Sequence, residues 1–176
     1  ALYDLRAAGI RAPLTIGITP VLAEQLADSL ILEHLRAYLA EKIEAAQRDI
    51  ARFEKTSDER LPLAHFYLDW HTSLLRSLED RYQGDLVGAF KRLQDEERIE
   101  VITCGATHGY LPLLARDSSI NAQIAVAVAS YRKHFGRAPR AIWLPECAYR
   151  PAFIEEGARR RGLEEFLAAH GLSLFF

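Results

Sequence analysis

Four short apolar segments constrain the fold of this 176-residue chain more than any other feature of its sequence. Each has the length of a β-strand, is rich in β-branched or aliphatic residues, and is bounded by glycine or proline. The segments are residues 14–18, 99–104, 141–144 and 172–176. Their apolar residues run on without alternating, as in strands that helices cover on both faces. This pattern predicts an α/β fold built on a parallel sheet or barrel.

A long helical region, residues 21–98, separates the first two predicted strands and is too large for a single crossover helix. Its first helix has apolar residues in steps of three and four, which define one helical face. These residues are Leu32, Leu35, Leu39, Ile43, Ala46, Ile50 and Phe53. The helix is expected to end near Lys55, where Thr56-Ser57-Asp58 breaks the pattern.

Two further helices are predicted in the same region. The second is expected to bury one side and to close at Gly84; that side comprises Leu63, Phe66, Tyr67, Trp70, Leu74, Leu78 and Tyr82. The third is expected from about Asp85, as its N-cap, to Arg98. A coiled coil is disfavoured because Pro62 and Gly84 interrupt the spacing. We therefore interpret 21–98 as a mainly helical insertion.

After the second strand the chain returns to the sheet through one helix. Ile120, Ile124, Val128, Tyr131 and Phe135 lie at helical spacing, and Gly136 is placed to end the helix. The last segment, 172–176, would form an open hydrophobic sheet edge if nothing followed it. We expect residues 1–176 to be part of one domain that continues beyond Phe176 in a parent protein.

Charge and cysteine content exclude several classes of protein. Lys and Arg number 22 and Asp and Glu 24, for a formal net charge of −2, so a nucleic-acid partner is not expected. No stretch approaches about 18 consecutive apolar residues, so no membrane partner is expected either. Cys104 and Cys147 form neither a dense disulfide pattern nor a C-x-x-C pair. We predict a cytoplasmic protein without metal or cofactor that acts on a neutral substrate.

The segment after the second strand is the first candidate site. Functional side chains of parallel barrels come from the carboxyl ends of the strands. Here Gly105 and Gly109 allow tight turns or the close approach of a ligand, and they bracket the hydroxyl of Thr107 and the imidazole of His108, with the phenol of Tyr110 directly following. His108 can hydrogen-bond a sugar hydroxyl or steady a charged neighbour. The alternative is that His108 merely ties down its loop.

The segment after the third strand is the second candidate site. Glu146 directly follows an apolar strand and is flanked by Trp143 and Tyr149, whose rings can pack on sugar faces. A partly desolvated carboxylate there can act as nucleophile, acid or base. The alternative is an ion pair between Glu146 and Arg150. Cys147 is not predicted as a nucleophile because no basic residue adjoins it.

These two segments carry a resemblance to a known family. The stretches Gly-Ala-Thr-His-Gly-Tyr-Leu-Pro at 105–112 and Trp-Leu-Pro-Glu-Cys-Ala-Tyr at 143–149 resemble the second and third signatures of glycoside hydrolase family 57, most closely those of its glycogen branching enzymes. The resemblance implies an incomplete (β/α)7 barrel with Glu146 as the nucleophile. It also implies substrate contacts from Thr107, His108, Tyr110, Trp143 and Tyr149.

The resemblance further implies retaining double displacement on an α-glucan such as amylose or glycogen, with cleavage of α-1,4 and formation of α-1,6 linkages. The family's first signature and its acid/base aspartate are absent from 1–176. The chain alone is therefore expected to be inactive and to need the remainder of the parent catalytic domain.

Other functions remain open. α-Amylase and 4-α-glucanotransferase activities of the same family share the nucleophile motif. A metal-dependent carbohydrate deacetylase would need two histidines one helical turn apart, whereas no two of His34, His65, His71, His108, His134 and His170 are four residues apart. A non-catalytic carbohydrate-binding domain would tolerate Glu146→Gln.

Overall fold

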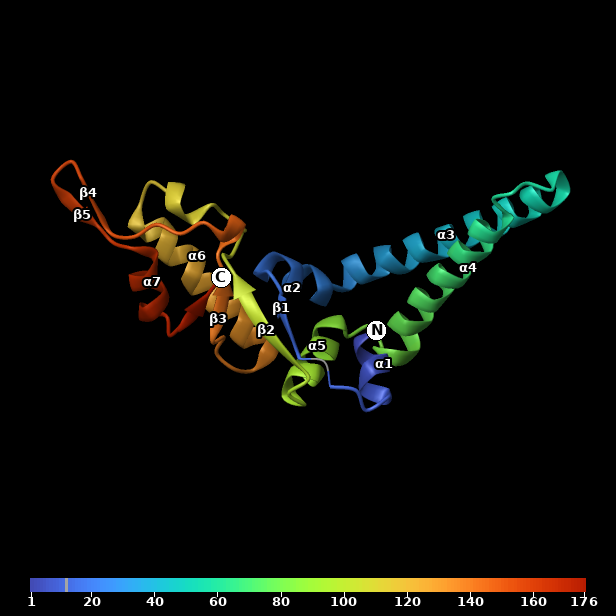
Figure 1. Ribbon diagram of the computed structural model, residues 1–176, viewed down its shortest axis with the longest axis horizontal. Coiled ribbons are helices and arrows are strands. Elements are labelled where there is room, and N and C mark those ends of the chain that lie inside the picture. Colours follow the sequence, from blue (N-terminus) through green and yellow to red (C-terminus); the bar gives the residue numbers. More distant parts are fainter. Residues whose placement is uncertain (12) are drawn as a thin grey trace. The chain divides into compact units, whose positions relative to one another are not determined.

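The computed structural model describes residues 1–11 and 13–176, which form two compact units (Figure 1). One unit contains Ala1–Gln25 and Val87–Phe176 and carries the sheet. The other contains Leu26–Leu86 and is helical. The predicted insertion, 21–98, is wider than the helical unit because most of its last helix belongs to the unit with the sheet.

Within the described residues, four parallel strands form the main sheet, in the order β1 (Leu14–Gly17), β2 (Ile99–Cys104), β3 (Ala141–Trp143) and β6 (Leu174–Phe175). Each strand pairs with the next one predicted from the sequence, as consecutive strands of a barrel do. The α/β class, the parallel sheet and the location of all four strands are thus confirmed.

Burial differs between the middle and the edges of this sheet. In β2, Val101, Ile102 and Cys104 are buried, as expected for a strand covered on both faces. In β1 and β6, Leu14 and Leu174 are exposed. The expectation that helices cover both faces of every strand is therefore wrong for the two edge strands, each of which pairs with one neighbour.

Helices of the sheet-bearing unit enclose its core. They are α1 (Leu2–Ala7), α2 (Pro20–Ala27), α5 (Leu86–Asp95), α6 (Asp117–Phe135) and α7 (Leu163–Ala169). The largest cluster joins Ile142 and Leu144 with Ile120, Ile124 and Phe166 from α6 and α7. The predicted α6 is confirmed, and it ends at Gly136 with a positive φ of 71°. No described helix combines the length and the apolar character needed to cross a bilayer.

A small hairpin was not predicted. Strands β4 (Phe153–Glu155) and β5 (Ala158–Arg160) pair antiparallel across two connecting residues. Both of them, Glu156 and Gly157, have positive φ, 50° and 78°. A type I′ turn needs this conformation at both central positions, and its usual sequence is Asn-Gly or Asp-Gly. Because Glu156, and not Asn or Asp, occupies the first central position, the sequence lacks the usual signature of this turn.

The helical unit is an antiparallel pair. Helix α3 (Ser29–Thr56) begins after Asp28, whose Oδ1 accepts a hydrogen bond from the Ile31 amide at 3.0 Å. Helix α4 (Leu61–Arg76) continues into a π-helical turn, Ser77–Arg81. Leu32 and Leu39 of α3 pack with Leu78, and Leu35, Leu75 and Leu86 pack against this cluster. The predicted end of the first helix is confirmed to within a residue.

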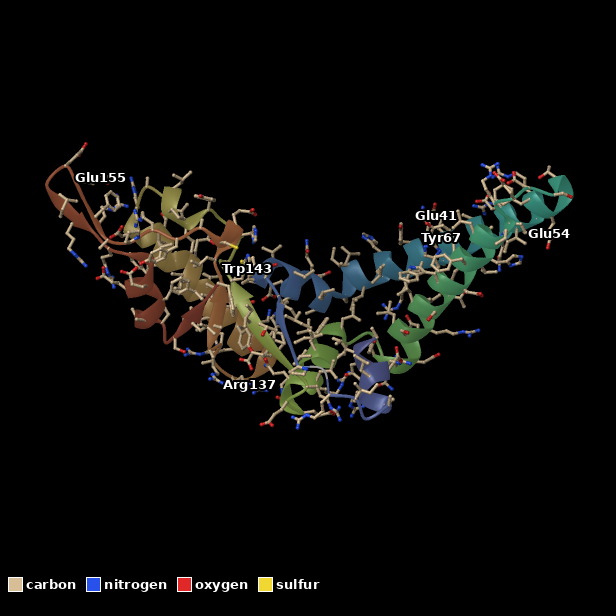
Figure 2. All side chains as sticks on the ribbon, viewed as in Figure 1. Glu41, Glu54, Tyr67, Arg137, Trp143 and Glu155 are labelled. Carbon is tan, nitrogen blue, oxygen red and sulfur yellow. The ribbon has the colours of Figure 1, made fainter. Side chains whose placement is uncertain are left out.

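The predicted buried side of α4 is mostly wrong. Leu63, Phe66, Tyr67, Trp70 and Leu74 are all exposed, with Phe66 at 53% and Trp70 at 52%. Figure 2 labels Tyr67 on this helix. Leu78 was predicted to be buried and is buried, in the π-helical turn that follows α4. Within α4 itself, Ala64 is buried and Leu75 packs against the α3 cluster. Helix α4 therefore has two apolar stripes, and α3 covers the narrower one.

Candidate active site

The structure brings His108 and Glu146 together. His108 follows β2 and Glu146 follows β3, and these strands are parallel neighbours, so both segments lie at the same edge of the sheet. Nε2 of His108 lies 3.3 Å from Oε1 of Glu146, although the residues are 38 positions apart. The sequence had predicted both positions as strand-end site residues.

Both residues adopt a left-handed backbone conformation, which is uncommon for residues other than glycine. His108 has φ of 57° and Glu146 of 58°, and Cys147 continues at 53°. The turn that carries Glu146 is the 3₁₀ segment Pro145–Cys147, where the amide of Cys147 donates to the Leu144 carbonyl at 2.8 Å. Such strain costs about 1 kcal/mol or more per residue and is concentrated at functional sites.

Gly105 allows the two segments to approach each other. A Cβ atom at this position would lie 3.2 Å from Cγ of Pro145, closer than most such contacts. At Gly109 the nearest atom would be 3.7 Å away, an ordinary distance. The missing side chain of Gly105 therefore brings the His108 loop against the Glu146 turn.

Gln123 of α6 holds the His108 loop in place, and sequence analysis missed it. Its Oε1 accepts a hydrogen bond from the Thr107 amide at 2.9 Å, and its Nε2 donates to Oγ1 of Thr107 at 2.8 Å. The Gln123 carbonyl also accepts from the Ala106 amide at 3.2 Å. An amide on an amphipathic helix gives no local signal of such a contact.

A cavity of about 430 Å³ lies beside this pair on one face of the sheet. Its lining comprises Thr15, Gly17, Thr19, Ile102, Cys104, His108, Trp143 and Phe176. Alternate residues of β1 and β2 supply half of it, as strand geometry requires. Thr15, Gly17 and Thr19 were not predicted as lining residues. Because side chains alternate between the two faces of a strand, Thr15 and Gly17 of β1 lie on one face, and the register of β1 against β2 places them on the same face as Ile102 and Cys104.

The surroundings of Glu146 bear on two expectations, that its carboxylate is partly desolvated and that it forms an ion pair with Arg150. Its side chain is 70% exposed, so the predicted partial desolvation of the carboxylate is not found. Arg150 is directed elsewhere: its Nη2 donates to the Arg161 carbonyl at 3.0 Å, and its guanidinium lies 4.8 Å from the centre of the Phe153 ring. Glu146 is therefore free of the structural ion pair considered above and contacts His108 instead.

The aromatic residues predicted to contact substrate differ in placement. Trp143, labelled in Figure 2, lines the cavity with His108 and stacks on Phe176 at 6.5 Å between ring centres. Tyr149 stacks on Phe175 at 5.4 Å and donates to Oε2 of Glu164, which raises the pKa of Tyr149. Tyr110 is exposed just before the 3₁₀ turn Leu111–Leu113. Of these three residues, Trp143 alone belongs to the described cavity lining.

Both cysteines are free thiols, and they differ in surroundings. Cys147 is exposed beside Glu146. Cys104 is buried at the end of β2, and its Sγ lies 3.3 Å from Nδ1 of His108. Burial raises the pKa of the Cys104 thiol. Among residues 1–11 and 13–176, no three His, Cys, Asp or Glu side chains gather as metal ligands would.

The chain is similar to known proteins in both sequence and structure. A curated relative, the 1,4-alpha-glucan branching enzyme TK1436 of Thermococcus kodakarensis, is 43% identical over 98% of this chain, which spans about a quarter (26%) of that relative. The crystal structure of TK1436, a family 57 branching enzyme, matches 99% of the chain with a TM-score of 0.88 and 41% identity. The chain covers 32% of that structure.

Two further solved structures are similar. The family 57-type branching enzyme of Pyrococcus horikoshii is 42% identical, with a TM-score of 0.86 over 99% of this chain and 34% of that one. The α-amylase AmyC of Thermotoga maritima is 30% identical, with a TM-score of 0.79 over the whole chain and 32% of that one. The sequence profile of glycosyl hydrolase family 57 matches residues 20–176. With its signature residues meeting at one edge of the sheet, the chain belongs to glycosyl hydrolase family 57.

Proposed function

We propose that this chain forms part of the catalytic barrel of a 1,4-α-glucan branching enzyme, with Glu146 as its nucleophile. The observation that carries the proposal is the contact between Glu146 and His108 beside a cavity lined by Trp143. An accessible carboxylate in contact with an imidazole and near an indole ring suits sugar chemistry. The relatives at 41–43% identity are branching enzymes, which favours this activity over others of the family.

The reaction proceeds by double displacement with retention. The Glu146 carboxylate attacks the anomeric carbon of an α-1,4-linked glucan, and the C–O bond to the leaving chain breaks as a general acid protonates it. A 6-hydroxyl of a second glucan chain then displaces Glu146 and forms the α-1,6 branch. We assign the general acid to an aspartate outside residues 1–176, so that the chain alone is inactive and needs the remainder of the catalytic domain.

The remaining site residues take supporting roles in this proposal. Trp143 provides a face on which a sugar ring packs, and His108 holds the Glu146 carboxylate. Thr107 has its Oγ1 engaged by Gln123 but keeps a hydroxyl proton to donate to a sugar oxygen. Tyr110 and Tyr149 offer exposed rings at the rim. The enzyme acts in cytoplasmic glycogen synthesis and needs no cofactor.

The test is to incubate the full-length enzyme with amylose and to look for new α-1,6 linkages by proton NMR. Branching produces these linkages, and linear products alone would contradict it. That second outcome would support α-amylase or 4-α-glucanotransferase activity, for which the similarity to AmyC is the motivating observation.

The role of Glu146 is tested with Glu146→Gln in the same enzyme. The substitution keeps the shape of the side chain but removes the nucleophilic oxygen, so turnover should fall by about 10⁴-fold or more while glucan binding persists. A matched control is Glu156→Gln in the β4–β5 turn, which removes an exposed carboxylate outside the site and should leave turnover unchanged. Unchanged turnover in Glu146→Gln would favour a non-catalytic glucan-binding domain.

A further inference from the structure

Three groups form a continuous line from the interior of the sheet to the proposed nucleophile. Sγ of Cys104 lies 3.3 Å from Nδ1 of His108, and Nε2 of the same ring lies 3.3 Å from Oε1 of Glu146. Both ring nitrogens are therefore engaged at once. The buried end of the line is rigid, since Cys104 is 2% exposed and pairs with Trp143 in the β2–β3 register.

The Glu146 carboxylate determines which nitrogen of the His108 ring carries the proton. An ionised carboxylate has acceptor sites alone, so the nitrogen that faces Glu146 must donate. In a neutral imidazole the other nitrogen, Nδ1, is then an unprotonated acceptor that needs a donor. A thiol is a donor while it keeps its proton, and burial of Cys104 favours the protonated form. The opposite tautomer would set two acceptors against each other at Glu146.

We propose that Cys104 is a positioning residue, whose thiol donates to Nδ1 of His108 so that Nε2 keeps the ring proton and donates to Glu146. The thiol fixes both the tautomer and the rotation of the ring. The backbone of His108 is held separately, because its amide donates to the Gly105 carbonyl at 3.0 Å. A buried residue thus determines how an exposed histidine presents its proton.

The catalytic consequence follows from the position of Glu146 on an exposed turn. Because its side chain is largely exposed, packing does not hold the carboxylate in one orientation. The Nε2–H donor restrains one oxygen and leaves the other to attack substrate. This consequence rests on the proposed function, whereas the Cys104–His108 contact itself does not.

The contact is tested on the 176-residue chain by long-range ¹H–¹⁵N NMR of the histidine rings. His108→Gln identifies the His108 resonances by their loss. At a pH where the ring is neutral, we expect Nδ1 of His108 to resonate as an unprotonated nitrogen shifted by an accepted hydrogen bond. Cys104→Ala should remove that shift, and Cys104→Ser, which retains a donor, should preserve most of it. A protonated Nδ1, or a Cys104→Ala spectrum unchanged at His108, overturns the proposal.

The catalytic consequence is tested in the full-length enzyme. Cys104→Ala should lower kcat roughly tenfold with little change in KM, the lower end of the effect of losing a histidine's outer partner. Cys104→Ser should restore most of the loss. Val101→Ala is the matched control: it truncates a buried residue of the same strand that does not line the cavity, so it should spare kcat.

Equal losses of kcat in Cys104→Ala and Cys104→Ser, or equal losses in Cys104→Ala and Val101→Ala, would reduce the role of Cys104 to packing and overturn the proposal. An enzyme that makes no α-1,6 linkages while the NMR pattern holds would instead overturn the proposed function. The positioning contact would survive that result.

Discussion

Helices α6 and α4 both carry five or more apolar residues at helical spacing, yet they bury different shares of them. In α6, Ile120, Ile124, Val128, Tyr131 and Phe135 are all buried. In α4, Leu63, Phe66, Tyr67, Trp70 and Leu74 are all exposed. Helix α6 contacts strand β2 and helix α7, whereas α4 packs mainly against helix α3.

The difference lies in the width of the surface that each helix meets. A sheet and a second helix together cover the broad stripe of α6 that carries these five residues, and Val126 on another side of the helix is exposed. A single neighbouring helix such as α3 covers only a narrow stripe of α4, along the line where the two helices meet. Helix α4 is apolar on two sides, so one side stays outside. Helical periodicity predicts that a helix forms, but the size of its neighbour decides which apolar row is buried.

The largest test of this contrast is Phe135→Ala in α6. Phe135 is 2% exposed, and its ring lies 4.6 Å from that of Tyr131, so truncation leaves a cavity in a packed core. We expect the free energy of unfolding to fall by about 3–5 kcal/mol. Urea denaturation followed by circular dichroism measures the loss. Phe66→Ala removes the same side chain from the exposed row of α4, and equal losses in the two variants would abolish the contrast.

The parts of the molecule that the sequence predicted are those with local signatures. Continuous apolar runs such as the one around Ile142 identified the strands, and the order of parallel strands then placed His108 and Glu146 at one edge. Gln123 and Thr15 were missed because their roles depend on partners far along the chain. The exposure of Trp70 was missed for the same reason, since the residues that would cover a helix face lie elsewhere in the sequence.

A smaller effect is expected from Gln123→Ala in α6. This change removes the two side-chain hydrogen bonds to Thr107, each worth about 1 kcal/mol, so the loss should be about 1–2 kcal/mol. Hydrogen exchange of the Thr107 amide should quicken because its acceptor is gone. Asn121→Ala, also in α6, is the control, because it breaks a contact with His170 at the end of α7 and leaves Thr107 untouched. Equal exchange of Thr107 in both variants would show that Gln123 does not hold the loop.

The exposed end of α6 predicts a pH effect. Lys133 and His134 contact Glu24, and the Lys133 hydrogen bond, with a further one from His134, lowers the pKa of Glu24 from 4.5 to about 2. Because the folded-state pKa is the lower one, this contribution to stability is present above pH 4.5 and is lost as the pH falls toward 2. Glu24 and Lys133 are exposed to solvent, so we expect only about 0.5 kcal/mol.

Comparison of the wild type with Glu24→Gln isolates this contribution. The stability difference between the two proteins should be largest at neutral pH and should shrink below pH 4.5. A ¹³C titration of the Glu24 carboxyl group measures its pKa directly. A difference that is constant over the whole range would mean that the ion pair does not stabilise the fold.

The smallest expected effect, and the one that most sharpens the contrast, is Trp70→Ala in α4. Truncating a tryptophan in a packed core lowers the free energy of unfolding by about 3–5 kcal/mol. Trp70, however, is half exposed, and its ring packs against Phe66 of the same helix. We expect a change below about 0.5 kcal/mol in this chain. A loss of about 2 kcal/mol or more, as for a core residue, would mean that the aromatic row of α4 is covered in solution. In that case the width of the neighbouring surface would not explain why α4 and α6 differ.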